Sequence, residues 1–183
     1  MKDTRELILN ASIEVFSEKG FTLTTTLEIS KKAGVSEMTL YRHFQTKNNL
    51  FLSAIKQAVG ESFTDDIALD SSKPLKSFMA DILHQKLTSI STHHALIKML
   101  IRETLANQLP GELAFTKMIY MQITDKLETY IKDNQLSLDA KALADLMVGF
   151  LLKYAIMSDL SYHTLSKTKQ KDYLNPYLNM INI

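Results

Sequence analysis

Residues 25–44, TTLEISKKAGVSEMTLYRHF, have the proportions of a helix-turn-helix. A short helical stretch, a turn that holds Gly34 and a second short helical stretch form the layout that places a second helix in the major groove of DNA. Small or apolar residues would lock the two helices together: Ile29, Ala33, Val35, Leu40 and Phe44. Most of the remaining positions of the second helix can hydrogen-bond phosphates or base edges: Ser36, Glu37, Met38, Thr39, Tyr41, Arg42 and His43. The stretch therefore predicts a DNA-reading helix over about 36–44.

The basic residues of the chain are concentrated around this motif. The chain as a whole is nearly neutral, with 21 Lys and Arg against 20 Asp and Glu. Residues 30–56 hold five bases against one acid, a net charge of +4, whereas residues 1–29 carry −2 and residues 57–183 carry −1. A basic cluster can be an ordinary solvated face. Beside a helix-turn-helix, it is better explained as a surface that contacts phosphates.

The composition excludes several classes of protein. The chain has no cysteine, which removes disulfides, thiolate nucleophiles and cysteine-ligated zinc. Its five glycines stand far apart, so no phosphate-binding glycine loop can form, and the adjacent pairs Asp65-Asp66 and His93-His94 would point in different directions on a helix. Its longest C-terminal apolar run, residues 146–152, is too short to span a membrane, and the N-terminus does not resemble a signal peptide. We expect a cytoplasmic protein with no cofactor, no metal and no enzymatic activity.

Apolar residues recur at helical spacing along the whole chain, which predicts an all-α fold of about nine helices. A three-helix helix-turn-helix domain over residues 1–47 would be followed by a larger helical domain over residues 48–183. Gly20 should end the first helix, because glycine readily adopts a positive φ. From caps and periodicity we expect helices over about 3–20, 25–33, 36–44, 46–59, 72–92, 94–108, 112–132, 138–154 and 165–180.

Residues 5–50 resemble the DNA-binding region of the TetR family of bacterial transcriptional regulators. The resemblance rests on residue types and spacings over about 45 positions: Arg5, Ile8-Leu9, Phe16, Gly20-Phe21, Thr25, Ile29, Ala33-Gly34-Val35-Ser36, Thr39-Leu40-Tyr41, His43-Phe44, Lys47 and Leu50. Met38 departs from the family, since many members have glycine there. An apolar side chain at this position could touch a thymine methyl group and alter sequence preference.

The resemblance implies which residues contact DNA. In this family the Tyr and Lys of the TLYxHFxxK pattern hold phosphates, and residues early in the third helix read bases. Thr25 could instead serve only as a helix cap, and Tyr41 could be a packing residue. Carried over by position, the DNA-binding set is Thr25, Thr26, Ser36, Glu37, Met38, Thr39, Tyr41, Arg42, His43 and Lys47.

The resemblance also implies that the larger domain dimerises through its last two long helices and binds a small effector. The apolar residues that would form the dimer interface are Leu143, Met147, Phe150, Leu151, Tyr154, Leu174, Tyr177 and Leu178. Residues that could line an effector cavity are His84, Met99, Phe115, Met118 and Met121. Either set could instead be core packing, an alternative that has more support for the methionines than for the dimer residues.

The favoured hypothesis is a repressor that binds a palindromic DNA operator as a homodimer and is released by a small, largely apolar effector. Its alternatives are a helical protein-binding adaptor and, with less support, an enzyme, neither of which would bind DNA.

Overall fold

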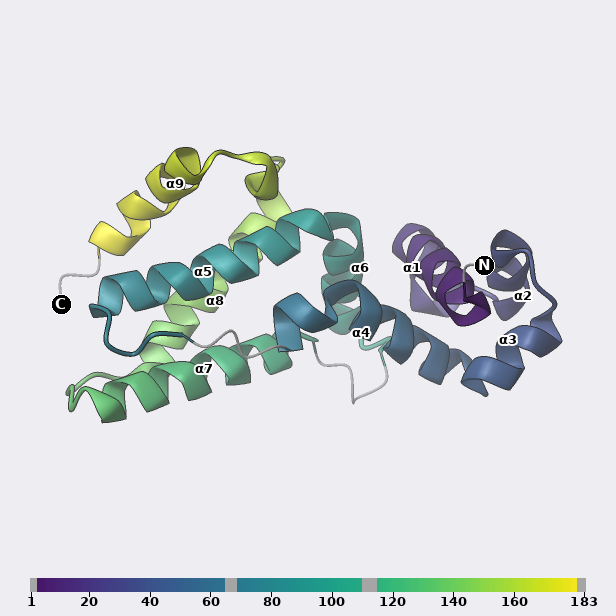
Figure 1. The fold of residues 1–183 in the computed structure, drawn as a ribbon, viewed down its shortest axis with the longest axis horizontal. Coiled ribbons are helices and arrows are strands. Elements are labelled where there is room, and N and C mark those ends of the chain that lie inside the picture. The colour runs from purple at the N-terminus through teal and green to yellow at the C-terminus, as the bar shows by residue number, and fades with distance from the viewer. Residues whose placement is uncertain (1–2, 65–68, 110–114, 181–183) are drawn as a thin grey trace. The chain divides into compact units, whose positions relative to one another are not determined.

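The computed structural model of the chain describes residues 3–64, 69–109 and 115–180. In these ranges the regular structure is entirely helical, which confirms the predicted all-α class (Figure 1). The pair Asp65-Asp66 considered in the sequence analysis lies outside the described ranges. The described part holds a short 3₁₀ turn at Tyr162–Thr164 and nine α-helices: α1 (Thr4–Leu23), α2 (Thr26–Ala33), α3 (Glu37–Phe44), α4 (Lys47–Thr64), α5 (Leu75–Thr92), α6 (His94–Leu105), α7 (Phe115–Asp133), α8 (Ala140–Met157) and α9 (Lys167–Asn179).

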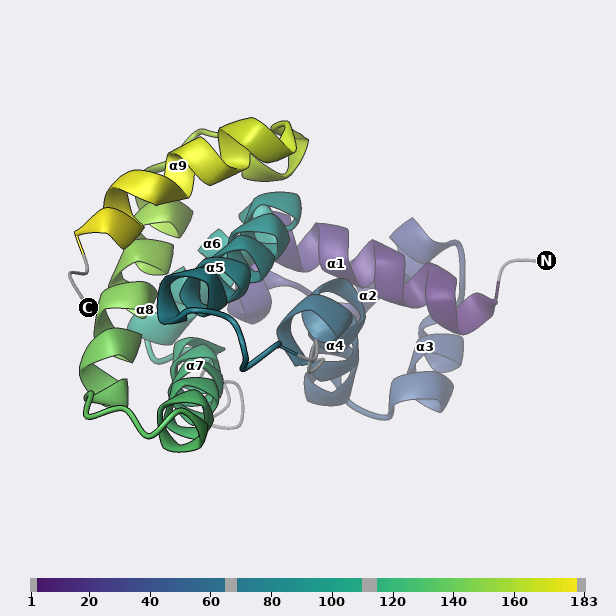
Figure 2. The same ribbon diagram turned by 60° about the vertical axis from the view of Figure 1, so that its left-hand side comes forward.

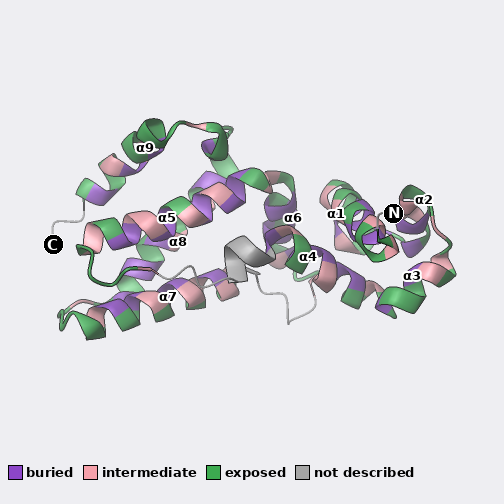
Figure 3. Cartoon of the chain, viewed as in Figure 1, coloured by how far each residue is buried: buried purple, intermediate pink, exposed green. Residues whose placement is uncertain are grey.

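The chain divides into two compact units. The first contains Met1–Glu61 and Ala95–Thr116, and the second contains Ser62–His94 and Lys117–Ile183. The first unit therefore holds α1 to α3, most of α4 and most of α6, whereas the second holds α5, most of α7, α8 and α9. Buried and exposed residues alternate along most helices with the helical period, as Figure 3 shows by colour.

Local sequence signals set the geometry of α2 and α3. Thr25 and Glu28 form a capping box at the start of α2, and Gly34 ends this helix in the left-handed conformation with φ +70°. Ser36 caps α3 by accepting a hydrogen bond of 3.1 Å from the amide of Thr39. Ile29 of α2 and Leu40 of α3 are fully buried, which fixes the two helices against the rest of the first unit.

Glu28 is expected to make stability depend on acid pH. Its carboxylate accepts hydrogen bonds from the Lys19 ammonium at 2.5 Å and from the amide and hydroxyl of Thr25, each at 3.1 Å. The hydrogen bond with Lys19 is the largest cause that lowers the pKa of Glu28 from 4.5 to about 2. Because Glu28 takes up its proton at a higher pH in the unfolded chain, the ionised group stabilises the fold at neutral pH, and this stabilisation is lost as the pH falls from 4.5 towards 2.

Glu28→Gln should therefore be less stable than the wild type at neutral pH, and the difference should shrink in acid. Urea unfolding over a pH series would measure this, with Glu128→Gln on the exposed side of α7 as the matched control. Parallel stability curves for wild type and Glu28→Gln through the acid range would contradict the assignment.

Helix α1 is interrupted at Gly20, shortly before the helix-turn-helix begins. Gly20 has φ +82° and ψ 172°, a conformation that is essentially restricted to glycine. Gly20 was predicted to end the helix through a positive φ; it does have a positive φ and interrupts the helix, but a further helical turn continues to Leu23. The Cα of Gly20 lies against the Glu103 side chain of α6, so an added Cβ would stand 2.5 Å from Glu103 Oε1.

The second unit is held together by α5, which contacts α8, α9 and the 3₁₀ turn. In Figures 1 and 2, α9 lies alongside α5. The hydroxyl of Tyr130 in α7 donates a hydrogen bond of 2.7 Å to the carbonyl of Lys73, just before α5. The break predicted at His93–His94 is confirmed, since His93 ends α5 and α6 begins at His94. Among the helices described, none has both the length and the apolarity to cross a membrane.

Candidate nucleic-acid interface

The surface of α3 presents a continuous set of exposed side chains. Leu40 and Phe44 are buried and anchor the helix from one side. On the other side Met38 has 82% of its surface exposed, and Tyr41, Arg42 and His43 are also exposed. A helix held by one apolar face with its opposite face free can enter a DNA groove without rearranging the core.

The residues Thr26, Glu37 and Tyr41 form a small hydrogen-bonded network. The Thr26 hydroxyl donates to Glu37 Oε1 at 2.5 Å and lies 3.1 Å from the hydroxyl of Tyr41. Thr26 itself is buried. The network connects the first turn of α2 to α3 and orients the Tyr41 hydroxyl at the surface.

The hydroxyl groups of Ser36 and Thr39 lie 2.9 Å apart at the start of α3. The two residues that cap the helices of the helix-turn-helix, Thr25 and Ser36, are both exposed to solvent, and Thr39 is half-buried. Capping uses a lone pair of the hydroxyl oxygen, and a phosphate needs its proton, so a hydroxyl of the Ser36–Thr39 pair can still donate to a phosphate, whereas the Thr25 hydroxyl would first have to leave Glu28.

Lys47, predicted to contact a phosphate, is packed against the last turn of α1. Its ammonium lies 4.6 Å from the ring centre of Phe21 and donates a hydrogen bond of 3.4 Å to the carbonyl of Thr22. Partial burial lowers the pKa of Lys47, while the charges of Glu103 and Glu28 act in the opposite direction. Lys47 thus places a positive charge near the capped end of α2.

The basic cluster of residues 30–56 is less uniform in the structure than its net charge indicates. Lys32 lies 2.7 Å from Glu14 of α1, and this ion pair neutralises it. Among the described residues, Lys31, Arg42 and Lys56 have no ion pair. Arg42 is the basic residue of α3 itself, so it is the strongest candidate for a DNA contact on this helix.

Arg5 extends the positive surface and was not among the residues predicted to bind DNA. Its guanidinium lies 5.4 Å from the ring centre of Phe44, at the end of α3, and the residue is exposed. Arg5 belongs to the motif that resembles the TetR family, and this position was the sequence signal that could have identified it.

The residues predicted to bind an effector are divided between the two units. Met99 is buried in the first unit, and the side chain of Phe115 lies outside the described residues. In the second unit Met118 is half-buried, Met121 is exposed and His84 lines a groove beside α9. No group of three or more His, Cys, Asp or Glu residues in the described ranges is arranged to hold a metal ion.

The predicted dimer residues are mostly buried within one protomer. Phe150 is half-buried and Tyr177 is partly exposed, with their ring centres 4.4 Å apart on α8 and α9. Leu146 of α8, which was not in the predicted set, has 63% of its surface exposed and lies one turn before Phe150. The predicted residues that the protomer itself buries are Leu143, Met147, Leu151, Tyr154, Leu174 and Leu178.

The chain is similar to known bacterial regulatory proteins both in sequence and in fold. A family model described as bacterial regulatory proteins of the tetR family matches residues 8–54. The chain is 30% identical to the HTH-type transcriptional regulator AcrR of Shigella flexneri over 156 residues, which cover 80% of this chain and 70% of AcrR. It is 29% identical over 133 residues to the regulator YerO of Bacillus subtilis; this match covers 69% of the chain but less than half of YerO, 45%. The fold is similar to that of a tetR-family regulatory protein from Rhodococcus RHA1, with a TM-score of 0.73, 19% identity and coverage of 99% and 98% of the two chains.

Proposed function

The chain belongs to the TetR family of bacterial transcriptional regulators, and on this premise we propose that it is a repressor that binds a palindromic operator as a homodimer and leaves it when a small effector binds. DNA binding would belong to residues 1–47, and effector binding and dimerisation to residues 48–183. We propose no enzymatic activity, since the similar curated proteins are transcriptional regulators.

The exposed face of α3 is the observation that carries this proposal. Met38, Tyr41 and Arg42 offer an apolar contact, a hydroxyl and a cation on a helix whose opposite face is buried. We assign base-edge or mixed contacts to Ser36, Glu37, Met38 and Arg42, and phosphate contacts to Thr25, Thr39, Tyr41, His43 and Lys47. Thr26 is buried and hydrogen-bonded, so its role in this proposal is to orient Tyr41.

A homodimer would present two copies of α3 to DNA. Recognition helices related by two-fold symmetry contact half-sites about one helical turn, ~34 Å, apart. An effector that binds more tightly to a conformer with another separation of the two helices would shift the population away from the DNA-binding form. Binding of the purified protein to the DNA upstream of its own gene tests the proposal, and absence of binding at low salt would overturn it.

The proposed dimer surface consists of the exposed side chains of α8 and α9. Leu146 and Phe150 lie one turn apart on α8, and Phe150 packs against Tyr177 of α9. The ammonium of Lys153 lies 5.8 Å from the ring centre of Tyr177. It places a positive charge at the border of the apolar surface. An apolar centre with a polar rim is the usual composition of a protein interface. Buried members of the predicted set, such as Met147, would support this surface from within the protomer.

Leu146→Asp is expected to dissociate the dimer. It would bury a carboxylate without a partner in each protomer, and such a group costs several kcal/mol, about enough to weaken association 100-fold or more. Light scattering at micromolar concentration would give the monomer mass. The control is Leu136→Asp, at a partly exposed site that follows α7. A dimer of unchanged stability in Leu146→Asp would remove this surface from the proposal.

A further inference from the structure

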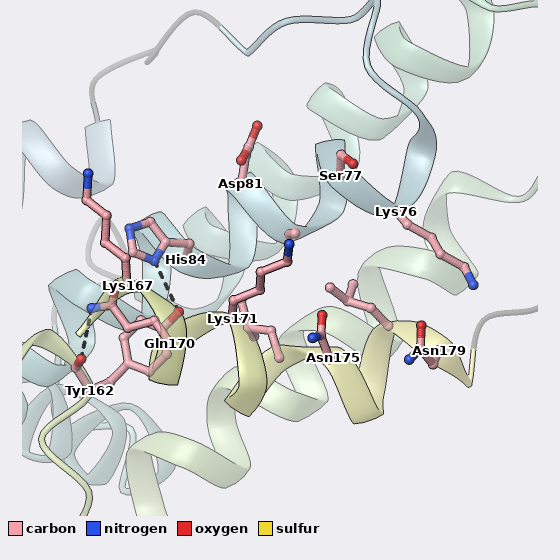
Figure 4. Close-up of a pocket in the computed structure, with 13 residues that line it drawn as sticks. Lys76, Ser77, Asp81, His84, Tyr162, Lys167, Gln170, Lys171, Asn175 and Asn179 are labelled. Atoms are coloured by element: carbon pink, nitrogen blue, oxygen red, sulfur yellow. Dashed lines mark hydrogen bonds between the residues drawn. The ribbon is translucent and has the colours of Figure 1, made fainter. Parts of the chain in front are cut away.

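A groove with a volume of about 530 Å³ runs between α5 and α9 in the second unit (Figure 4). This volume lies within the range of ~300–1,000 Å³ that is common for small-molecule sites. Its lining comes from one face of each helix. Ser77, Asp81 and His84 follow one another at helical spacing on α5, and Lys171 and Asn175 do so on α9.

The groove carries an excess of positive charge. Lys76 of α5 and Lys167 and Lys171 of α9 line it, and the two lysines of α9 are four residues apart and therefore on the same face. None of these three lysines has an ion pair within the described part of the chain. The aspartate of the lining, Asp81, is already bound by Lys73 at 2.7 Å. An anion entering the groove would thus meet cations that have no competing partner.

The end of the groove near Lys167 also holds a hydrogen-bonded pair, Tyr162 and His84. Tyr162 is fully buried, and its hydroxyl lies 3.1 Å from Nδ1 of His84. Burial raises the pKa of Tyr162 to about 12, so its hydroxyl keeps its proton at neutral pH. This hydrogen bond occupies Nδ1 of His84 and orients its ring along the groove. Gln170 holds this arrangement by donating to the Tyr162 carbonyl at 3.1 Å.

The rest of the lining includes apolar side chains. Leu174 and Leu178 continue the face of α9 beyond Lys171, and Ala80 lies on α5. A ligand extended along α9 would pass from Lys167 and Lys171 to a wall that contains Leu174 and Leu178 together with Asn175 and Asn179, and Lys76 lies at that far end (Figure 4). Such a pattern fits an amphiphile better than an inorganic ion, because burial of a short hydrocarbon chain adds about 0.8 kcal/mol per CH₂ group to the attraction between charges.

We propose that this groove binds a small organic anion, a carboxylate or phosphate monoester with a short apolar chain, whose charged group lies between Lys167 and Lys171 and whose chain lies along Leu174 and Leu178. The binding itself follows from the groove alone. Its consequence, release of DNA by the bound anion, rests on the proposed function. The expectation of a largely apolar effector would then be replaced by that of an amphiphilic anion.

Calorimetric titration of the full chain with three probes of equal chain length tests the proposal. Hexyl phosphate, hexanoate or both should bind, whereas hexanol should bind at least about tenfold more weakly than the better anion, because it cannot pair with the lysines. Binding of one anion only would assign the charged group as phosphate or carboxylate.

Variants of α9 then locate the site. Lys167→Gln with Lys171→Gln should weaken binding of the better anion about 100-fold, at about tenfold for each charge-assisted hydrogen bond removed. Lys169→Gln is the matched control, since it makes the same change on α9 at an exposed position that does not line the groove. Circular dichroism would confirm that each variant is folded.

Three results would overturn the proposal: binding of neither anion, binding of hexanol as tight as that of the anions, or equal losses in the double variant and in Lys169→Gln. DNA affinity is measured separately on the same samples. If the anion binds and DNA affinity is unchanged, the site stands and its role as effector site is rejected. If DNA is not bound without the anion either, the proposed function fails independently of the groove.

Discussion

Arg42→Ala is expected to weaken binding to the operator roughly 100-fold. Arg42 is exposed on α3, and its guanidinium has no ion pair among the described residues, so it is free to donate to a base edge or a phosphate. Removal of such an interaction costs about 1–3 kcal/mol, and a homodimer would lose two of them. Since every ~1.4 kcal/mol is a factor of ten, a loss of about 3 kcal/mol gives the expected factor.

Fluorescence anisotropy at several salt concentrations would distinguish a phosphate interaction from base reading. If Arg42 binds a phosphate, the slope of log affinity against log salt should shrink by about 1 for each phosphate that the variant no longer binds. If it reads a base, preference for the operator over other DNA should fall instead. Lys98→Ala, an exposed change on α6, is the control for the removal of a positive charge. Equal affinity of Arg42→Ala and Lys98→Ala would remove Arg42 from the interface.

Gly20→Ala is expected to destabilise the first unit by about 3 kcal/mol. An alanine would have to adopt the conformation at φ +82° and ψ 172°, which costs on the order of 1–3 kcal/mol. Its Cβ would also stand 2.5 Å from Glu103 Oε1 and 2.9 Å from an Arg102 nitrogen. Glu103 is buried, with no hydrogen-bond partner for Oε2 within the described residues, so it cannot move aside into solvent without opening the packing around Gly20.

The free energy of urea unfolding measures this effect. The variant Gly34→Ala separates the cost of the backbone conformation from the cost of the steric clash. Gly34 also has a positive φ, +70°, but no atom lies within 4 Å of an added Cβ, so Gly34→Ala should cost only about 1 kcal/mol. Glu103→Ala combined with Gly20→Ala should recover the steric part of the loss and not the backbone part. If Gly20→Ala and Gly34→Ala lower the free energy of unfolding equally, the contact between Glu103 and residue 20 does not contribute to the loss.

The local geometry of the helix-turn-helix could be predicted because its causes are local. Thr25 and Ser36 cap the helices that follow them, and Gly34 adopts the positive φ that ends α2. These signals depend on residues three or four positions apart. The partners of Lys32 and Lys47 could not be predicted in this way, because Glu14 and Thr22 come close to them only when helices pack.

Apolar periodicity did not separate core residues from surface residues in α8. Leu143 and Leu146 are both leucines at helical spacing, yet Leu143 is buried in the protomer and Leu146 is largely exposed. Which face of the helix meets α5 is a property of the packed unit. The cationic groove was missed for the same reason, since Lys76 and Lys171 are 95 positions apart in the sequence and come to line one groove only because α5 and α9 pack together.

We propose that this chain recognises an operator through the exposed face of α3. The most direct test is an anisotropy titration of the wild-type protein with the duplex upstream of its own gene and with a scrambled duplex of the same composition. At about 150 mM salt we expect the upstream duplex to bind at least ~1,000-fold more tightly than the scrambled one, and both affinities to fall as salt increases. Equal affinity for the two duplexes, or no binding to either at about 50 mM salt, would contradict the claim.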